Sequence, residues 1–417
     1  MSSIKIHPPE VKSDNEISIK IDIPLKTKKY FKNDELVIKY DFDVSSVPAS
    51  ILTIPAVTLV CPVAWATGVD VTVDEIDQDY YRSMFNVREG FERLYPGLFD
   101  TESEINTTPV ENTNGSGTDT AMLFSGGVDS TTSYYRHRDE SPTLINIVQE
   151  RDDEKKIKNQ TKYINRFSEQ MGVYSTRIYT NAHSVLDVPI LSLDFIEELS
   201  RDWWNAIHYG IYYMAVCAPY TYYYGVSDLH QGSSYTSNRD LPEAQPFIVE
   251  SLSWTGTTNS ITEDEFKRHE KISVIADFVR SEDSITISSC YNRSARENCM
   301  NCEKCFRTAL GAAAVGVHPD DIGFPVTDDT VESIKRYLEG NDFTGFHAHM
   351  WREIQDRTNR DEFAIDGESL VDTFLSTQIE PDVAGREVKM STKEILYKYI
   401  PYPVNYIIAK TIISIKN

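Results

Sequence analysis

The chain has 417 residues, of which 40% are hydrophobic and 25% are charged, and its formal net charge is −23. This composition is sufficient for a hydrophobic core and excludes a disordered or fibrous protein. The acidic balance argues against a protein that binds nucleic acid or an anionic membrane through overall charge, so nucleic acid is not an expected partner. The length predicts two or three domains, or one enlarged α/β domain.

Neither end of the sequence predicts export or a membrane span. The first residues, from Met1 to Lys5, contain no apolar signal core. The most apolar late stretch, residues 404–415, is interrupted by Asn405 and Lys410 and is shorter than the roughly 20 residues that a membrane span needs. Secreted disulfide scaffolds are smaller and denser in cysteine. We therefore expect a cytoplasmic protein with no membrane span.

The first hundred residues combine strand and helix patterns. Apolar and polar side chains alternate on both sides of a lysine-rich turn within residues 17–43, which predicts a β-hairpin. Residues 49–65 are continuously apolar and fit either a buried helix or a buried strand, because periodicity cannot separate the two. A short strand is predicted at 71–73 and a helix at 73–94.

Residues 100–119 are polar and rich in Asn, Gly and Ser, which is typical of a loop or linker. Apolar strands and helices then alternate, which predicts a parallel sheet covered by helices on both faces. The predicted strands cover 121–124, 144–148, 174–179 and 226–232, and the predicted helices cover 128–138, 152–171, 203–224, 329–338 and 346–357.

The fold class expected from this pattern is α/β, with a β-containing N-terminal extension and a mainly helical C-terminal region. The predicted parts are a hairpin-containing region (1–99), a polar linker (100–118), an α/β domain (119–288), a cysteine-rich segment (289–318) and the helical region (319–417).

The most informative motif is Ser125-Gly126-Gly127-Val128-Asp129-Ser130, which directly follows the predicted strand at 121–124. A strand that leads through a glycine turn into a helix directs backbone N–H groups and the positive helix end toward one point, where phosphate oxygens can bind. The glycines allow close backbone approach and the serines add hydroxyl donors. Asp129 would be repelled by phosphate alone, and its expected partner is Mg²⁺ bound to the nucleotide.

This hexapeptide resembles the SGGxDS loop of the PP-loop ATP pyrophosphatases. The resemblance implies a PP-loop type of α/β fold and an enzyme that cleaves ATP between the α and β phosphates. Such enzymes transfer AMP to a carbonyl or carboxylate oxygen, which a nitrogen or sulfur nucleophile then displaces. By analogy of position, the strand end at residues 146–149 would hold adenine and ribose.

A second motif gathers four of the six cysteines, Cys290, Cys299, Cys302 and Cys305, in one short stretch. The overlapping C-x-x-C-x-x-C spacing places three thiols on a tight turn, and a fourth thiol can complete a tetrahedral metal site. Structural zinc is favoured over an Fe–S cluster, which the same four ligands could hold, but spacing alone cannot name the metal. Four cysteine ligands make a closed site, so the metal is expected to hold the fold and to do no chemistry. Two disulfides are disfavoured in a cytoplasmic protein.

The order and spacing of the two motifs, over roughly residues 119–310, resemble those of the 7-cyano-7-deazaguanine synthase family. Members of that family use ATP and ammonia to convert a carboxylate into a nitrile through an amide. The segment Cys302-Glu303-Lys304-Cys305-Phe306-Arg307-Thr308 differs from the synthase pattern and looks more like a paralogous group. A shared fold and zinc site do not transfer a substrate.

Four basic residues are candidates to stabilise charge on the α-phosphate: Arg268, Lys271, Lys304 and Arg307. With Asp129, we expect Arg268 and Lys271 to be catalytic, although a solvated helix face is the simpler interpretation of each basic residue taken alone.

Other residues have a structural and a functional interpretation. Asp228, His230 and Ser233 follow a strand toward its carboxyl end, where α/β sites gather, but a lone histidine is more often a packing residue. The aromatic residues Trp203, Trp204 and 222–224 could stack on a nucleobase, but their helical spacing favours the core. The two remaining cysteines, Cys61 and Cys217, lie in apolar sequence that favours inert buried thiols.

The leading hypothesis is an ATP-dependent ligase that adenylates a small-molecule acid and then forms a C–N bond. The chain start carries no glutaminase cysteine, so the expected nitrogen source is free ammonia, an amine or a separate glutaminase. The alternatives are a sulfur-inserting PP-loop enzyme acting on tRNA or a small molecule, and a nucleotide-binding protein without turnover. A homodimer is compatible with the sequence.

Overall fold

The structure, a computed structural model, describes residues 3–100, 102–113, 117–199, 202–234, 246–281, 286–292, 297–345, 348–365 and 368–381. The apolar stretch at 404–415 lies outside these ranges. Within them, none of the helices has both the length and the apolar character that crossing a membrane requires.

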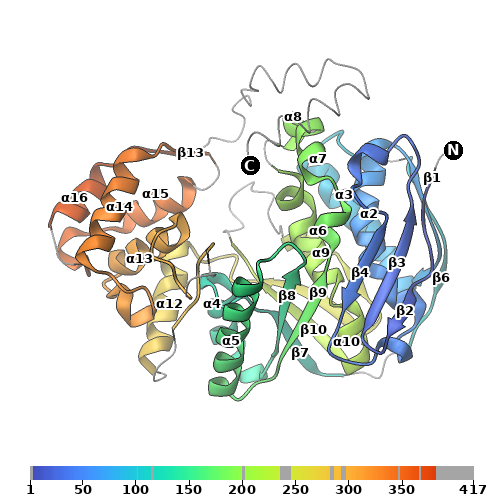
Figure 1. The fold of residues 1–417 in the computed structure, drawn as a ribbon, viewed down its shortest axis with the longest axis horizontal. Coiled ribbons are helices and arrows are strands. Elements are labelled where there is room, and N and C mark those ends of the chain that lie inside the picture. Colours follow the sequence, from blue (N-terminus) through green and yellow to red (C-terminus); the bar gives the residue numbers. More distant parts are fainter. Residues whose placement is uncertain are drawn as a thin grey trace.

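Five parallel strands form the centre of the sheet: β7 (Asp119–Leu123), β8 (Thr143–Gln149), β9 (Ser175–Thr180), β10 (Val226–Gly232) and β12 (Thr257–Thr262). Their order across the sheet is β9-β8-β7-β10-β12 (Figure 1). The chain therefore runs outward from β7 to β9 and then returns to the other side of β7. This reversal leaves a crevice at the carboxyl ends of β7 and β10, where open α/β sheets bind their ligands.

Helices cover both faces of this central sheet, as the sequence predicts. Successive side chains of a strand point to opposite faces, and Ala121 and Met122 on β7 belong to different hydrophobic clusters. Ala121 packs in the cluster that includes Ala218 of α10, whereas Met122 packs in the cluster that includes Phe167 of α5. The helices of this part are α4 (Val128–His137), α5 (Glu154–Met171), α6 (Ala182–Val185), α7 (Val188–Asp194), α8 (Ile196–Leu199), α9 (Tyr209–Ala215), α10 (Ala218–Tyr224) and α11 (Pro246–Val249).

The N-terminal strands extend the same sheet. The predicted hairpin is confirmed, since β3 (Glu16–Asp22) and β4 (Glu35–Lys39) pair antiparallel, and β4 also pairs antiparallel with β9. Within the described residues the sheet has 12 strands. The others are β1 (Ser3–Ile6), β2 (Glu10–Ser13), β5 (Asp70–Asp77), β6 (Ile105–Val110) and the edge strand β11 (Ser253–Trp254).

The apolar stretch at 49–65 forms helices, namely α1 (Ala49–Leu52) and α2 (Ile54–Thr67). Two predictions nearby are wrong. The helix expected from residue 73 is α3 (Gln78–Leu94), because β5 continues to Asp77, whose carboxylate caps the helix by accepting a hydrogen bond from the amide of Tyr80 at 2.9 Å. Within the expected polar loop, β6 pairs with β5 at the edge of the sheet, where polar residues and proline are tolerated.

The C-terminal part is helical (Figure 1). It has its own hydrophobic cluster. The helices predicted at 329–338 and 346–357 are confirmed as α14 (Asp328–Gly340) and α15 (Ala348–Arg357). The other elements are α12 (Arg268–Ser281), α13 (Glu303–Ala314), α16 (Glu368–Ser376) and the short parallel pair β13 (Phe343–Gly345) and β14 (Ile379–Pro381).

The helix predicted over 203–224 is divided. A π-helical turn (Trp204–His208) leads into α9, and α10 begins at Ala218, followed by Pro219, which has no amide hydrogen to continue the preceding helix. Trp203 and Trp204 are buried in the core, which confirms the structural interpretation of this pair.

Burial around His208 fixes its neutral form. The Trp203 indole donates to Nδ1 of His208 at 3.1 Å, so Nε2 carries the hydrogen and donates to the Leu59 carbonyl at 2.9 Å. Burial lowers the pKa of His208 to about 4. The unfolded chain therefore binds a proton at higher pH than the folded chain does.

We expect acid to destabilise the fold through His208. Above pH 7 the residue is neutral in both states and contributes no pH dependence. As the pH falls from 6.5 toward 4, proton binding to the unfolded state removes up to about 3 kcal/mol of unfolding free energy. Urea unfolding at pH 7.5, 6.5, 5.5 and 4.5 should show a shallower pH slope for His208→Gln than for the wild type. Parallel curves for the two proteins would contradict this assignment.

Candidate functional site

The glycine–serine loop lies where the sequence predicts it, between the carboxyl end of β7 and the first turn of α4. Gly127 is the N-cap residue of α4, so the amides that follow it belong to a helix end whose first N–H groups have no partner within the helix. The hydroxyl groups of Ser125 and Ser130 lie 3.3 Å apart, and Ser130 Oγ also donates to the carbonyl of Gly127. The loop thus presents amides and hydroxyls in one place.

Gly126 is required by the backbone and by its surroundings. Its φ angle is +77°, in the left-handed region that favours glycine. A Cβ atom at this position would lie 2.1 Å from Cε1 of Tyr163, on α5. By contrast, the nearest atom to a Cβ at Gly127 would be 3.5 Å away.

Val128 contributes to the core, not to the loop surface. Its side chain is buried in a hydrophobic cluster that also contains Ile272 of α12 and Cys305 of α13. Next to it, the amide of Ser288 donates to the Gly126 carbonyl at 2.7 Å. Only the backbone of Val128 is thus available to a ligand, and the cysteine-rich segment packs directly against the loop.

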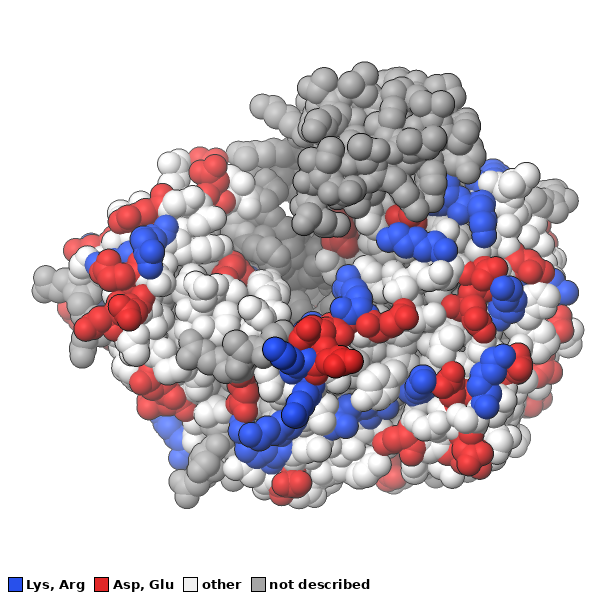
Figure 2. All heavy atoms as spheres, viewed as in Figure 1, with Lys and Arg blue, Asp and Glu red and all other residues white. Residues whose placement is uncertain are grey.

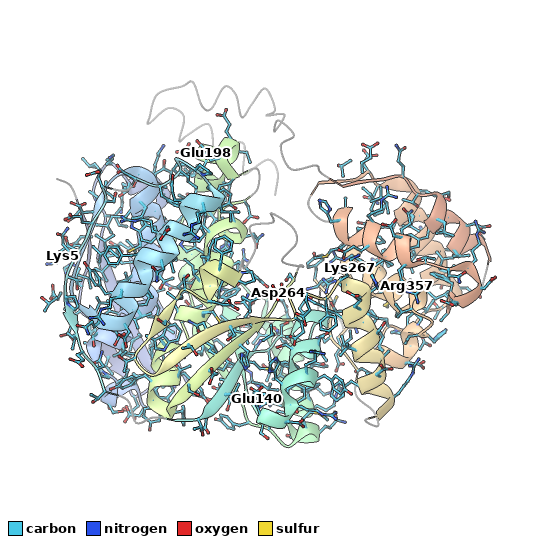
Figure 3. The ribbon with its side chains drawn as sticks, turned by 180° about the vertical axis from the view of Figure 1, so that it is seen from behind. Lys5, Glu140, Glu198, Asp264, Lys267 and Arg357 are labelled. Atoms are coloured by element: carbon cyan, nitrogen blue, oxygen red, sulfur yellow. The ribbon has the colours of Figure 1, made fainter. Side chains whose placement is uncertain are left out.

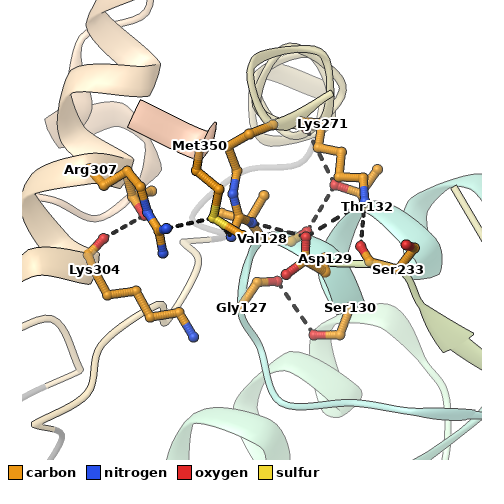
Figure 4. Close-up of polar contacts among 12 residues, drawn as sticks. Gly127, Val128, Asp129, Ser130, Thr132, Ser233, Lys271, Lys304, Arg307 and Met350 are labelled. Carbon is orange, nitrogen blue, oxygen red and sulfur yellow. Dashed lines mark hydrogen bonds and ion pairs between the residues drawn. The ribbon is translucent and has the colours of Figure 1, made fainter. Parts of the chain in front are cut away.

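Asp129 forms an ion cluster with Arg268 and Lys271, the two cations predicted to act with it (Figure 4). Oδ1 of Asp129 is 2.9 Å from Nη1 of Arg268 and 3.7 Å from Nζ of Lys271. Lys271 also donates to the carbonyl of Ser233, just after β10. The structure therefore brings the three predicted catalytic residues together.

The interpretation of the cations as a solvated helix face is wrong for three of the four. The exposed fractions are 1% for Lys271, 3% for Arg307 and 7% for Arg268, whereas Lys304 is half-buried. Burial acts to raise the pKa of Asp129, but the surrounding cations outweigh it and hold the pKa below the ordinary value. Burial lowers the pKa of Lys271, and Asp129 opposes that shift.

The loop lines a cavity of about 520 Å³ together with Arg268, Lys304 and Arg307. Lys271 does not line it and reaches the site only through Asp129. Met350 of α15 separates Arg268 from Arg307, since its sulfur contacts both guanidinium groups. Figure 2 shows acidic and basic side chains interspersed over one face of the molecule.

Part of the predicted adenine position lies in the cavity. Asn146 of β8 lines it and donates to the Phe124 carbonyl at 3.1 Å, whereas Gln149 lies outside the lining and bonds to Tyr213 at 3.4 Å. Sequence reasoning missed several lining residues. Tyr291 directly follows the metal-ligand candidate Cys290, and the others come from segments without a motif: Gln160, Asp202, Asn205, Tyr209, Tyr213, Gln231, Ser234 and Met350.

Several other candidates lie away from the cavity. Asp228 bonds to Ser227 and Thr258 on the sheet, and His230 faces α4. The tyrosines at 222–224 cluster near Phe42. The isolated thiols of Cys61 and Cys217 are fully buried, and burial raises the pKa of each. None of these side chains lines the cavity.

The four clustered cysteines meet in space. Their sulfur atoms all lie within 4.8 Å of one another, with Cys290–Cys302 and Cys299–Cys305 each at 3.9 Å. A tetrahedral zinc site with Zn–S bonds of about 2.3 Å requires sulfurs about 3.8 Å apart. All four are free thiols, and 3.9 Å is far longer than a disulfide bond of about 2.05 Å.

The backbone of this segment also suits a metal site. The amides of Asn292 and Cys299 donate to the sulfur of Cys290, and the amide of Asn301 donates to that of Cys299. Neighbouring thiols lower the pKa of Cys302 and raise that of Cys305. A divalent cation is what would allow all four to ionise together.

The loop geometry predicts different effects for its two glycines. Gly126→Ala should lower the free energy of unfolding by about 2–4 kcal/mol, because the new methyl group meets Tyr163 in a left-handed conformation. Gly127→Ala is the matched control, and should cost less than about 1 kcal/mol, because its φ angle is negative and space is available. Urea unfolding measures both, and equal losses would contradict the packing argument.

The cysteine cluster predicts one tightly bound metal at this site. Cys302→Ser should remove it, whereas Cys217→Ser, which changes an isolated buried thiol, should leave the cluster's metal content unchanged. Metal analysis of the purified proteins by plasma mass spectrometry measures this. Retention of metal on the four-cysteine site after Cys302→Ser would contradict the ligand assignment.

The loop, the cation cluster and the cysteine site are the three groups of residues that indicate a function for this chain. The chain matches no family model, no curated protein and no solved structure in the comparisons with known proteins. The arrangement of these residues, described above, is therefore the basis of the functional proposal.

Proposed function

We propose that this protein is an ATP pyrophosphatase of the PP-loop type, which adenylates a small-molecule acid and then forms a C–N bond. The observation that carries the proposal is the position of the Ser125–Ser130 loop at the sheet crevice, facing buried cations from a second part of the chain. Amides at a helix N-terminus and fixed cations are the groups that stabilise pyrophosphate and a developing negative charge.

The cavity supports a nucleotide with its phosphates at the loop. Its volume lies within the range of about 300–1,000 Å³ that is usual for small-molecule sites. With pyrophosphate at residues 125–130, the base would extend along the carboxyl end of β8, beside Asn146. Arg268, Lys304 and Arg307 would then neutralise charge around the α-phosphate, which is the centre attacked by the acid substrate.

Asp129 offers the oxygen ligand that Mg²⁺ prefers, and phosphate oxygens and water would complete the coordination. Bound Mg²⁺ would neutralise the phosphates and orient the leaving pyrophosphate. Because Oδ1 of Asp129 already accepts from Arg268, the same carboxylate also positions a cation at the site. Removing this carboxylate would leave Lys271 buried without its counter-ion. A loss of activity in Asp129→Ala would therefore combine the loss of the Mg²⁺ ligand with a loss of stability.

We assign zinc to the cysteine cluster, with a structural role. Four cysteine ligands leave no open position for substrate. The metal would hold the segment that donates the Ser288 amide to the loop and would fix the start of α13, which carries Lys304 and Arg307.

A nitrogen nucleophile is favoured over sulfur by the state of the cysteines. A sulfur-inserting enzyme needs a reactive thiol near the acceptor. Cys61 and Cys217 are fully buried with raised pKa values, and the other four thiols form the metal cluster. Ammonia, an amine or a separate glutaminase would supply the nitrogen.

The proposal predicts that the protein releases AMP and pyrophosphate in equal amounts from MgATP when a suitable acid and ammonium are present. Lys304→Ala should lower this rate about 100-fold, because one fixed charge at the transferred phosphate is lost. Lys267→Ala is the matched control, because Lys267 is exposed and just precedes α12. Radiolabelled ATP with separation of AMP and pyrophosphate measures the rates.

Three outcomes separate the hypotheses. Absence of pyrophosphate with every class of acid, together with tight ATP binding, would indicate a nucleotide-binding protein without turnover. Turnover that requires a sulfur donor would favour the sulfur-inserting alternative. Equal rates for Lys304→Ala and Lys267→Ala would contradict the role given to the cavity.

A further inference from the structure

A second group of metal-ligating side chains lies outside the cavity, where α4 ends against β10. His137 is the last residue of α4, Glu140 follows in a 3₁₀ turn (Arg138–Glu140), and His230 projects from β10. One ligand atom from each lies within 4.8 Å of the others. Figure 3 shows Glu140 apart from Lys267, which just precedes the C-terminal helices.

The contacts converge on Glu140. Its Oε1 is 2.7 Å from Nδ1 of His137, and its Oε2 is 3.2 Å from Nε2 of His230. Zinc bound by nitrogen and oxygen at about 2.0–2.2 Å requires ligand atoms about 3.3–3.5 Å apart, so small side-chain movements would accommodate the metal. Two imidazoles and one carboxylate are a ligand set typical of zinc.

A second carboxylate lies near the other ring nitrogen of His137. Glu263, directly after β12, is 5% exposed, and its Oε1 lies 3.5 Å from Nε2 of His137 and 3.4 Å from Nε of Arg136. A metal-binding histidine commonly donates its other N–H group to a carboxylate in this way, which fixes the ring and its tautomer. Nδ1 of His137 would then face the metal.

The surroundings hold the His230 imidazole beside Glu140. His230 is only 8% exposed, and its Nε2 is the ring nitrogen that faces the Glu140 carboxylate. Glu140 is exposed on its outer side, which leaves a path for a metal and room for a water ligand.

We infer that His137, Glu140 and His230 bind one Zn²⁺, with Glu263 holding His137 in place. The site is separate from the four-cysteine cluster and does not depend on the proposed ATP chemistry. Its metal would join the end of α4 to β10, and α4 begins at the glycine–serine loop. The inference gives the chain two zinc sites of different chemistry.

The test is the zinc stoichiometry of the full-length protein at about 10 µM free Zn²⁺, a level at which a specific site of this kind should be filled. We expect two zinc ions per chain for the wild type and one for both His230→Gln and Glu140→Gln. Glu140 is exposed, so its variant should fold even if His230→Gln does not. His318→Gln is the matched control, because His318 lies beside Asp320 on the surface, and it should retain two.

Cobalt distinguishes the two sites. With Co²⁺ in place of zinc, the cysteine site gives a sulfur-to-cobalt charge-transfer band that Glu140→Gln should not alter, while total cobalt falls by one per chain. A wild-type protein whose metal is all accounted for by the sulfur-to-cobalt band, or a metal content that Glu140→Gln leaves unchanged, would overturn the inference and leave an ion-pair cluster without metal.

Discussion

The candidate site depends on one electrostatic constraint, which is that Lys271 and Arg268 are buried. A cation removed from water costs several kcal/mol unless a partner compensates for it, and Asp129 is that partner. Asp129 stands in the first turn of α4, whereas both cations stand on α12. The requirement for pairing therefore holds the glycine–serine loop against the helical C-terminal part, and the cavity lies at that contact.

The same constraint explains how an acidic chain can present a positive site. The net charge of −23 is spread over the whole sequence, whereas four basic side chains line or approach one cavity. Over the distances within such a cavity, local charges dominate, because salt screens more distant ones beyond about 8–10 Å. Overall charge thus argues against broad polyanion binding and says little about one small phosphate ligand.

Much of the fold could be predicted from the sequence. The hairpin, the parallel strands and the helices α14 and α15 follow from periodicity, since each has a hydrophobic face that a particular geometry must bury. The pairing of β4 with β9 could not be predicted, because strand partners far apart in sequence are chosen by the assembled sheet. The strand β6 could not be predicted for a related reason. An edge strand buries little apolar surface, so its polar sequence is typical of a loop.

The predictable part of the site was the part carried by local motifs. The Ser125–Ser130 loop and the four cysteines are contiguous or nearly so, and their spacing predicted that each group would come together. Arg268 and Lys271 could be named as candidates, but their burial depends on tertiary packing. Residues such as Tyr209 and Met350 reach the cavity from helices whose sequence carries no sign of it.

The antiparallel pairing of β4 with β9 also has a consequence for how the chain folds. Ile38 pairs with Thr180, so about 140 residues separate the two partners. Closing so long a loop costs entropy before the contact returns any stability, and non-local pairing of this kind slows folding. During synthesis the N-terminal strands leave the ribosome well before β9 exists. Until β9 has been made, the edge of β4 that pairs with it has unpaired hydrogen-bonding groups. During this interval the chain is most exposed to pairing with another copy of itself.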